Sequence, residues 1–305
     1  MKRLALFPAV AIGLVAALAA EAQARQAPPA PSVTTTTVGA NLDITPKRVT
    51  FSPSQRTASV YIFNQGTAPA TFDIAMIDRV MLPDGQIVAV EDAQKQADSK
   101  AVADKVASAR NMILISPRRA TLAPGPGQTI RLRVGSVPPD AKGEYRTHLT
   151  VTTIPPPSVG TTVDDAAAGD NNELRFQITS VFGLSIPAIV RVSAPEVSAA
   201  IQNPRIEYAQ LSPDAQSAPT RTAIMVFALA RTGANSLFGN VEVRAADKRG
   251  EPIGIARGVG VYPEIDRRTM RIPLTRIPAP GEKLEVSFTD DDTSPGKLLA
   301  TVQVP

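Results

Sequence analysis

Beyond residue 40, apolar and polar residues alternate along the chain in short runs. In the run at 70–78, Phe72, Ile74 and Met76 alternate with smaller or polar residues. Alternation with a period of two is typical of strands that place one face on a core. Pro83-Asp84-Gly85 lies between two apolar runs and predicts a hairpin turn. The strands predicted up to residue 154 are 41–44, 48–51, 58–64, 70–78, 112–116, 128–134 and 144–154.

Four segments interrupt this pattern. Residues 91–110 place several alanines and valines on one helical face, which is compatible with a helix or with a solvated loop insertion. Residues 117–125 predict a turn, and the Pro, Gly, Ala and Asp-rich segment 155–172 predicts a long loop. The apolar pattern at 173–192 contains a glycine and a proline, which argue against a helix and favour a long strand that bends or changes partner.

A second set of short apolar runs follows residue 193 at a spacing of about ten residues. Short strands separated by turns at regular intervals are typical of β-sandwiches. We therefore predict an all-β protein with two sandwich domains that join near residue 192. The strands predicted in the second domain are 199–208, 222–231, 239–247, 253–261, 269–274, 283–288 and 298–304.

The N-terminus has the layout of a cleaved secretory signal over residues 1–24. Met1-Lys2-Arg3 precedes an apolar run at 4–20, and Ala22-Gln23-Ala24 supplies the small residues that a signal peptidase requires. A membrane anchor is the alternative, but about 17 apolar residues are at the lower limit for spanning a bilayer. Residues 25–40 are rich in Pro, Ala and Thr and predict a flexible lead-in. The predicted domains are then 41–192 and 193–305, in an extracytoplasmic compartment and without membrane insertion after cleavage.

Composition excludes several classes of function. The 305 residues include no cysteine and one histidine, so disulfides, thiolate metal sites, cysteine nucleophiles and clusters of imidazole ligands are absent. The formal net charge is only +4, with the basic residues spread along the chain, and aromatic residues make up 4%. Few stacking platforms and no basic block argue against a nucleic-acid partner.

Three groups of residues have only part of the pattern of a catalytic, calcium-binding or phosphate-binding site. His148 lies within a predicted strand among threonines, where a catalytic triad would need both of its partners beside it. Asp290-Asp291-Asp292 lacks the spacing of a calcium loop, and Gly258-Val259-Gly260 is too short for a phosphate loop and precedes no helix. We expect no enzymatic activity, no metal and no cofactor.

Four stretches of the chain resemble the periplasmic chaperones of the chaperone/usher pilus pathway. The resemblance implies a divergent member of that family. The stretches are Lys47–Phe51 with Ala58–Asn64, Ile115–Arg118 with Leu122–Gly125 and Gln128–Leu132, Gly143–Tyr145 with Ile154–Pro156, and Leu174–Ile178. The resemblance covers residues 41–192 and implies two immunoglobulin-like β-sandwich domains in tandem. It also implies a protein that stabilises pilus or fimbrial subunits and delivers them for surface assembly.

In that family, a donor strand completes a subunit sandwich that lacks one strand, because an unpaired edge and an open groove invite aggregation. The resemblance places the donor strand at Leu174, Phe176 and Ile178, whose side chains share one face. Burying three such side chains is worth on the order of 5 to 8 kcal/mol before ordering costs. The alternative is that the three residues fill the core of this protein.

The family also holds the terminal carboxylate of the subunit between its two domains, with an Arg and a Lys. Arg48 matches the Arg, and a guanidinium suits a carboxylate. The Lys position falls on Gly183, so that either Arg191 or another basic side chain replaces the Lys, or the protein binds its client differently. Glu144 matches a family residue that pairs with an Arg on the donor strand, but Pro187 stands at the expected Arg position.

The resemblance implies the periplasm as location, a pilus-type subunit as partner and an outer-membrane usher as a further partner. It also allows a homodimer in which the free edge caps itself. The 91–110 insertion and the cysteine-free loop at 155–172 depart from the family. A structural or adhesive envelope protein with two sandwiches and no chaperone activity is the alternative function.

Overall fold

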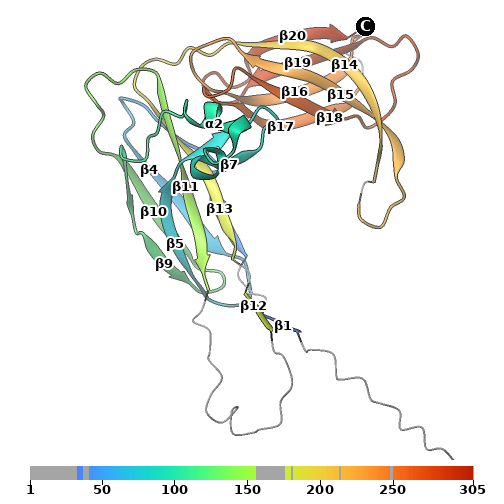
Figure 1. Cartoon of the computed structure of the whole chain (residues 1–305). Helices are drawn as coiled ribbons and strands as arrows, with labels where there is room; N and C mark the ends of the chain where they lie inside the picture. The colour runs from blue at the N-terminus through green and yellow to red at the C-terminus, as the bar shows by residue number, and fades with distance from the viewer. Residues whose placement is uncertain are drawn as a thin grey trace, which may run out of the picture. The chain divides into compact units, whose positions relative to one another are not determined.

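The computed structural model describes residues 33–36, 41–155, 176–179, 181–212, 214–247 and 250–304. The predicted signal at 1–24, Leu174 and most of the predicted loop at 155–172 lie outside the described residues. Among the described residues, no helix is long and apolar enough to cross a membrane. The fold is all-β with two immunoglobulin-like sandwiches, as the sequence predicts (Figure 1).

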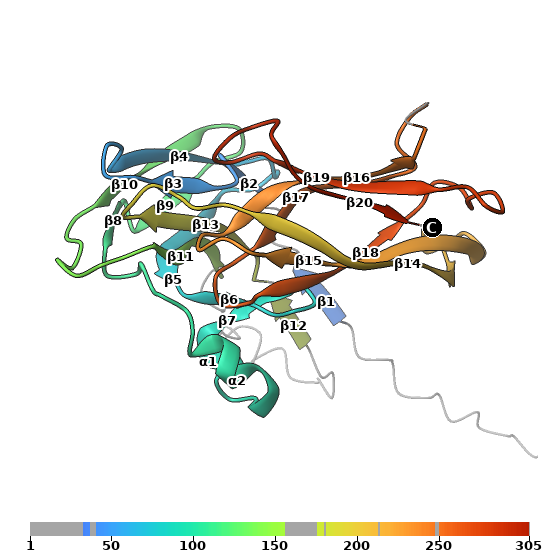
Figure 2. The same cartoon turned by 90° about the horizontal axis from the view of Figure 1, so that it is seen from above.

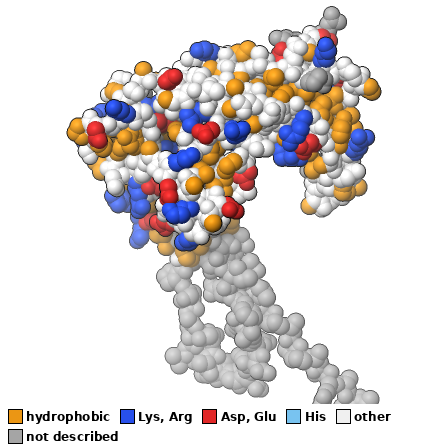
Figure 3. All heavy atoms as spheres, turned by 45° about the horizontal axis from the view of Figure 1, so that its top comes forward, with side chains coloured by type: hydrophobic (Ala, Val, Ile, Leu, Met, Phe, Trp, Pro, Cys, Tyr) orange, Lys and Arg blue, Asp and Glu red, His pale blue; other side chains and the backbone are white. Residues whose placement is uncertain are grey.

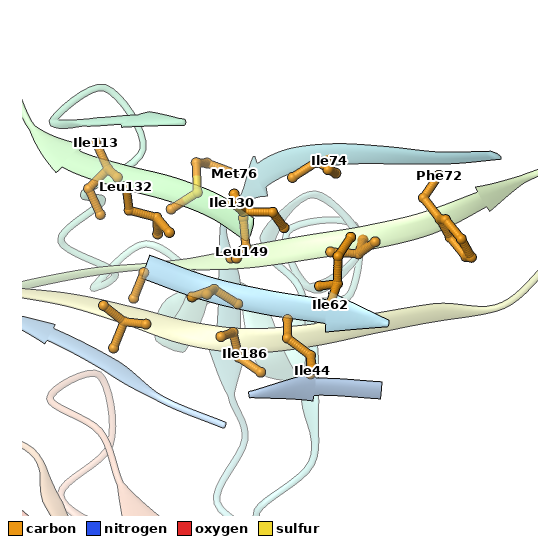
Figure 4. Close-up of a cluster of buried hydrophobic side chains, with 14 of the residues drawn as sticks. Ile44, Ile62, Phe72, Ile74, Met76, Ile113, Ile130, Leu132, Leu149 and Ile186 are labelled. Atoms are coloured by element: carbon orange, nitrogen blue, oxygen red, sulfur yellow. The ribbon is translucent and has the colours of Figure 1, made fainter. Parts of the chain in front are cut away.

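The first sandwich packs a four-stranded sheet on a five-stranded sheet. The four-stranded sheet has the order β2 (Leu42–Thr45), β4 (Thr57–Asn64), β10 (Gly127–Val134) and β8 (Ile113–Ser116). The five-stranded sheet has the order β3 (Val49–Phe51), β13 (Gly183–Arg191), β11 (Glu144–Ile154), β5 (Ala70–Ile77) and β9 (Arg119–Leu122). Alternate residues of these strands meet between the sheets, where Ile62 and Ile130 of one sheet and Phe72 and Leu149 of the other are fully buried (Figure 4).

The second sandwich has its own hydrophobic core, which includes Phe227, Val241 and Phe288. Figure 2 shows the strands of its two sheets. Its three-stranded sheet has the order β14 (Ala199–Leu211), β15 (Thr220–Arg231) and β18 (Arg267–Pro273). Its four-stranded sheet has the order β17 (Gly254–Val261), β16 (Leu237–Ala245), β19 (Leu284–Asp290) and β20 (Leu298–Val304).

The predicted hairpin forms, and two short helices follow it at the start of the predicted insertion at 91–110. The hairpin consists of β6 (Arg79–Met81) and β7 (Ile87–Ala89), with the predicted turn at Pro83-Asp84-Gly85, and the helices are α1 (Val90–Ala93) and α2 (Ala97–Ala103). Val80, Ala93 and Ala103 bury a small core of their own. Both sequence-based alternatives are therefore partly right, because the segment is helical only in short pieces.

Three elements differ from the predictions. The predicted turn at 117–125 contains β9, which pairs with β5 because Ala120 and Leu122 face the core. The predicted long strand at 173–192 is divided into β12 (Phe176–Thr179) and β13, and the predicted change of partner occurs between them, because β13 pairs with β11 and β12 does not. Within the predicted lead-in, β1 (Val33–Thr36) pairs with β12 in a separate two-stranded sheet.

Charged side chains of both signs are interspersed over the face of the molecule that Figure 3 shows. Mixed charges of this kind keep a surface soluble without creating one strong field.

Candidate functional site

The first half of β13 has one free backbone edge. β11 pairs with β13 along Gly183–Arg191, whereas β3 covers the other side only at Ala188–Val190. Thr153 donates its N–H to the carbonyl of Phe182 at 2.8 Å. Because an antiparallel ladder alternates, the N–H and C=O groups of Gly183 and Ser185 point away from β11. Among the described residues, these groups pair with no further strand and can accept an added one.

Pro187 fits this edge. It lies opposite His148 in the register with β11, at a position whose backbone nitrogen faces the open side. A proline there removes no hydrogen bond from the ladder, which is why prolines occur on edge strands. β13 continues through this proline without interruption.

An open, mainly apolar cavity of about 340 Å³ lies beside the free edge. Its lining residues are Asn41, Leu42, Phe182, Gly183 and Leu184. Val181 and Phe182, which precede β13, expose 56% and 47% of their surface. Large exposed apolar side chains next to unpaired backbone groups are features of a strand-binding edge.

The predicted donor residues lie just before this edge in the chain. Phe176 and Ile178 are in β12, whose partner is β1, and Leu174 is outside the described residues. Their side-chain environment is therefore untested, and their role in binding a partner stays a prediction. Phe182 has the same even spacing as these three residues, so an uninterrupted strand would place all four on one face.

Arg48 contacts the second sandwich. Its Nη2 donates to Oδ2 of Asp292 at 2.9 Å, and its guanidinium carbon lies 4.7 Å from the centre of the Phe238 ring. Its side chain is 11% exposed. The residue thus lies between the two sandwiches, but it already has a carboxylate partner.

The partner of Glu144 is Arg191, which the sequence left open. Nε of Arg191 donates to Oε2 of Glu144 at 3.0 Å, and its Nη2 donates to Oδ2 of Asp292 at 2.6 Å. Burial acts to lower the pKa of Arg191, but Asp292 and Glu144 outweigh it and raise the pKa above its ordinary value. Arg191 is therefore a permanently charged bridge between the two carboxylates.

Arg146 makes a second buried contact between the sandwiches. Its guanidinium pairs with Glu264 and stacks on Tyr262, with 3.8 Å from the guanidinium carbon to the ring centre. Glu264 also accepts the backbone N–H of Met81 at 2.8 Å. Sequence reasoning missed Glu264, Tyr262 and the role of Asp292, because no local pattern connects them with the arginines.

His148 is 1% exposed, and its Nε2 lies 3.5 Å from Nη1 of Arg146. Burial first, and then the charges of Arg146 and Arg79, lower the pKa of His148 to about 2. The ring is therefore neutral at ordinary pH and is shielded from solvent.

Asp290, Asp291 and Asp292 form no metal site in the described part of the chain, where no group of three His, Cys, Asp or Glu side chains could hold an ion. Asp290 accepts hydrogen bonds from Thr293 and Ser294, while Asp292 binds the two arginines.

No protein-family model matches the chain, and no curated protein matches it in sequence. Solved structures do match over most of its length. The E. coli chaperone DraB is 11% identical, with 90% of this chain and 99% of that chain covered and a TM-score of 0.41. The Pseudomonas aeruginosa CupB2 chaperone is 12% identical, with 86% and 98% covered and a TM-score of 0.40. A chain from the Salmonella enterica complex of SafA pilin with the SafB chaperone is 12% identical, with 88% and 98% covered and a TM-score of 0.41.

Proposed function

We propose that this protein is a periplasmic chaperone that binds pilus-type subunits along the free edge of β13. The observation that carries the proposal is the unpaired backbone at Gly183 and Ser185, with exposed Phe182 and an apolar cavity beside it. A subunit strand placed there gains ladder hydrogen bonds from the backbone and apolar contacts from alternate side chains.

The free energy of apolar burial favours a partner subunit whose own sandwich lacks a strand. Burying an exposed aromatic or aliphatic side chain such as Phe182 or Val181 is worth on the order of 1.5–3 kcal/mol. A complete sandwich has no open groove to receive them, whereas one that lacks a strand exposes both a groove and two unpaired edges. The edge of β13 therefore suits subunits that would otherwise aggregate.

In this proposal, Leu174, Phe176 and Ile178 extend the binding strand ahead of Phe182. The subunit places its terminal carboxylate at Arg48, with Arg191 as the second cation in place of the family's lysine. The predicted signal at 1–24 delivers the chain to the periplasm. An outer-membrane usher would then receive the bound subunit.

The test is recovery of partners from the envelope fraction of the native cells, with the tagged protein as bait and mass spectrometry as the readout. Phe182→Asp, Phe176→Asp and Arg48→Ala are compared with wild type. Tyr208→Asp is the matched control, because Tyr208 is an exposed aromatic residue of the second sandwich, remote in the chain from β13.

The expected result is a small secreted β-protein that accompanies wild type and Tyr208→Asp and is lost from the other three variants. If all folded variants keep the same partners, the strand at 174–182 packs within this protein and does not bind a subunit. The structural or adhesive envelope function then replaces the chaperone function.

A further inference from the structure

Arg48 is nearly enclosed in this structure, with 11% of its side chain exposed. Its Nε and Nη1 are buried and have no hydrogen-bond partner within the described residues. Its remaining nitrogen, Nη2, binds Asp292, with Oγ of Ser236 at 3.4 Å. A buried guanidinium with two unpaired N–H donors lowers the stability of the fold. A carboxylate bound in a bidentate manner would pair these donors.

Asp292 bridges both of the arginines that the proposed function assigns to a subunit. One oxygen, Oδ2, lies 2.9 Å from Nη2 of Arg48 and 2.6 Å from Nη2 of Arg191. Arg191 keeps Glu144 as a second partner at 3.0 Å, but among the described residues Arg48 has no other carboxylate. Loss of Asp292 alone would therefore leave Arg48 charged, buried and unpaired.

The turn that carries Asp292 is held together by its own hydrogen bonds. Asp290 accepts from the Thr293 hydroxyl and the Ser294 N–H, each at 2.6 Å, and Gly296 adopts a φ of 87° that closes the turn. Outside the turn, Asp292 binds the two arginines, and the Asp291 N–H donates to the Phe238 carbonyl at 3.0 Å. Such a turn can move as a unit, since few contacts outside it have to break.

We infer that Asp292 is a built-in carboxylate that occupies the Arg48 and Arg191 site until the terminal carboxylate of a subunit exchanges with it. The inference rests on the proposed function and adds its regulation. Exchange of one carboxylate for another keeps both guanidinium groups paired, whereas a neutral chain end would leave Arg48 without a counter-charge. The site therefore selects a free C-terminus, and subunit binding releases the Asp292 turn of the second sandwich.

The test compares two probe peptides, acetyl-Val-Thr-Val with a free carboxylate and the same peptide as an amide. Binding is followed by nuclear magnetic resonance at the Arg48 Nε–H, which Arg48→Lys assigns. Asp292→Asn removes the internal carboxylate with almost no change of shape. Asp291→Asn removes one charge from an exposed position of the same turn and is the matched control.

Asp292→Asn is expected to bind the carboxylate peptide about tenfold more tightly than wild type does, as loss of a competing charge-assisted pair predicts. The amide peptide gains nothing, and Asp291→Asn behaves as wild type. If wild type and Asp292→Asn bind the carboxylate peptide equally through Arg48, the internal competition is wrong and the proposed function stands. If neither protein distinguishes carboxylate from amide, the role of Arg48 in the proposed function fails as well.

A second measurement needs no variant. Hydrogen exchange of wild type at saturating carboxylate peptide is expected to accelerate at the amides of Asp291, Ser294 and Gly296, because the turn leaves its place. Unchanged exchange in the presence of bound peptide would overturn the inference.

Discussion

At the scale of single residues, the same trio of groups occurs twice between the sandwiches. In each trio, an arginine of the first sandwich lies over an aromatic ring of the second sandwich and pairs with a carboxylate there. One trio is Arg48, Phe238 and Asp292, and the other is Arg146, Tyr262 and Glu264. Stacking and ion pairing together allow a guanidinium to be buried, because its planar face and its edge are satisfied by different groups.

His148 predicts how stability depends on pH. Its pKa is about 2 in the folded protein and about 6.5 in an unfolded chain. The unfolded state therefore binds the proton more readily. The contribution of neutral His148 to the free energy of unfolding is complete above pH 6.5. Below pH 6.5 the free energy of unfolding falls by about 1.4 kcal/mol per pH unit. Between pH 7 and pH 5 the loss is roughly 2 kcal/mol, in a range where most carboxylates remain ionised.

The measurement is denaturant unfolding at pH 7, 6 and 5, for wild type and for His148→Gln. His148 is the one histidine of the chain, so the variant is expected to show a much flatter free energy of unfolding over this range. The comparison uses slopes, and a uniform loss of stability in the variant does not affect it. Equal slopes in the two proteins would contradict the predicted pKa of His148.

Glu264→Gln tests the second trio. The substitution retains an acceptor for the Met81 N–H but leaves the buried Arg146 without its counter-charge. Removing one partner of a buried pair costs about 3–5 kcal/mol in unfolding free energy. Lys100→Gln breaks an exposed pair with Asp104 and is the control, with little expected change. In the double variant Arg146→Gln with Glu264→Gln, the two losses should not add, and additive losses would show that the pair is not coupled.

The site was less predictable from sequence than the fold. Arg48 could be singled out because its surroundings resemble a family motif, but its partner Asp292 is 244 positions away. Glu264 is 118 positions from Arg146, and its neighbours form no motif. Local periodicity shows which face of a strand is buried, and it does not show which distant side chains meet across an interface.

At the scale of elements, strands with clear alternation were predicted to within a few residues. β11 was predicted with its correct bounds, but its alternation did not reveal that the polar residues Arg146 and His148 are buried. β9 was missed because its four residues, RATL, lie between prolines and read as part of a turn. Short edge strands form mainly because a neighbouring strand, here β5, pairs with them. Their own hydrophobic pattern contributes less.

Gly239 is an element-scale feature that a single methyl group should disrupt. It lies beside a register irregularity of β16, and a Cβ there would be 2.0 Å from the carbonyl oxygen of Thr289. Since this obstacle is backbone, Gly239→Ala must push β19 away, at a cost of about 2–3 kcal/mol or more. Gly135→Ala is the control, because its Cβ would meet Leu114 at an ordinary 3.5 Å. Thermal or denaturant unfolding of the two variants measures the difference, and equal stabilities would contradict the close approach in β16.

At the scale of the whole molecule, the insertion between β5 and β8 links the two hydrophobic cores. Met81 at the end of β6 belongs to the core cluster of the second sandwich, although its chain segment leaves the first. The Pro83 carbonyl accepts the Thr269 N–H of β18 at 2.8 Å, and the Gly85 backbone lies against the Arg268 side chain. The hairpin thereby covers part of the free edge of β18, which protects that edge from unwanted pairing.

This link predicts that a change in the insertion weakens the second sandwich. Met81→Ala removes a buried side chain from the second core, and Met76→Ala removes one from the first core only. Each should cost about 2–5 kcal/mol. Hydrogen exchange with mass spectrometry separates the two effects, since Met81→Ala should accelerate exchange in β15 and β18, whereas Met76→Ala should accelerate it in β5 and β11. If Met81→Ala leaves β15 and β18 as protected from exchange as in wild type, the hairpin contacts the second sandwich without stabilising it. If both variants accelerate all four strands equally, the two sandwiches open as one cooperative unit, and the insertion together with the two arginine trios couples them.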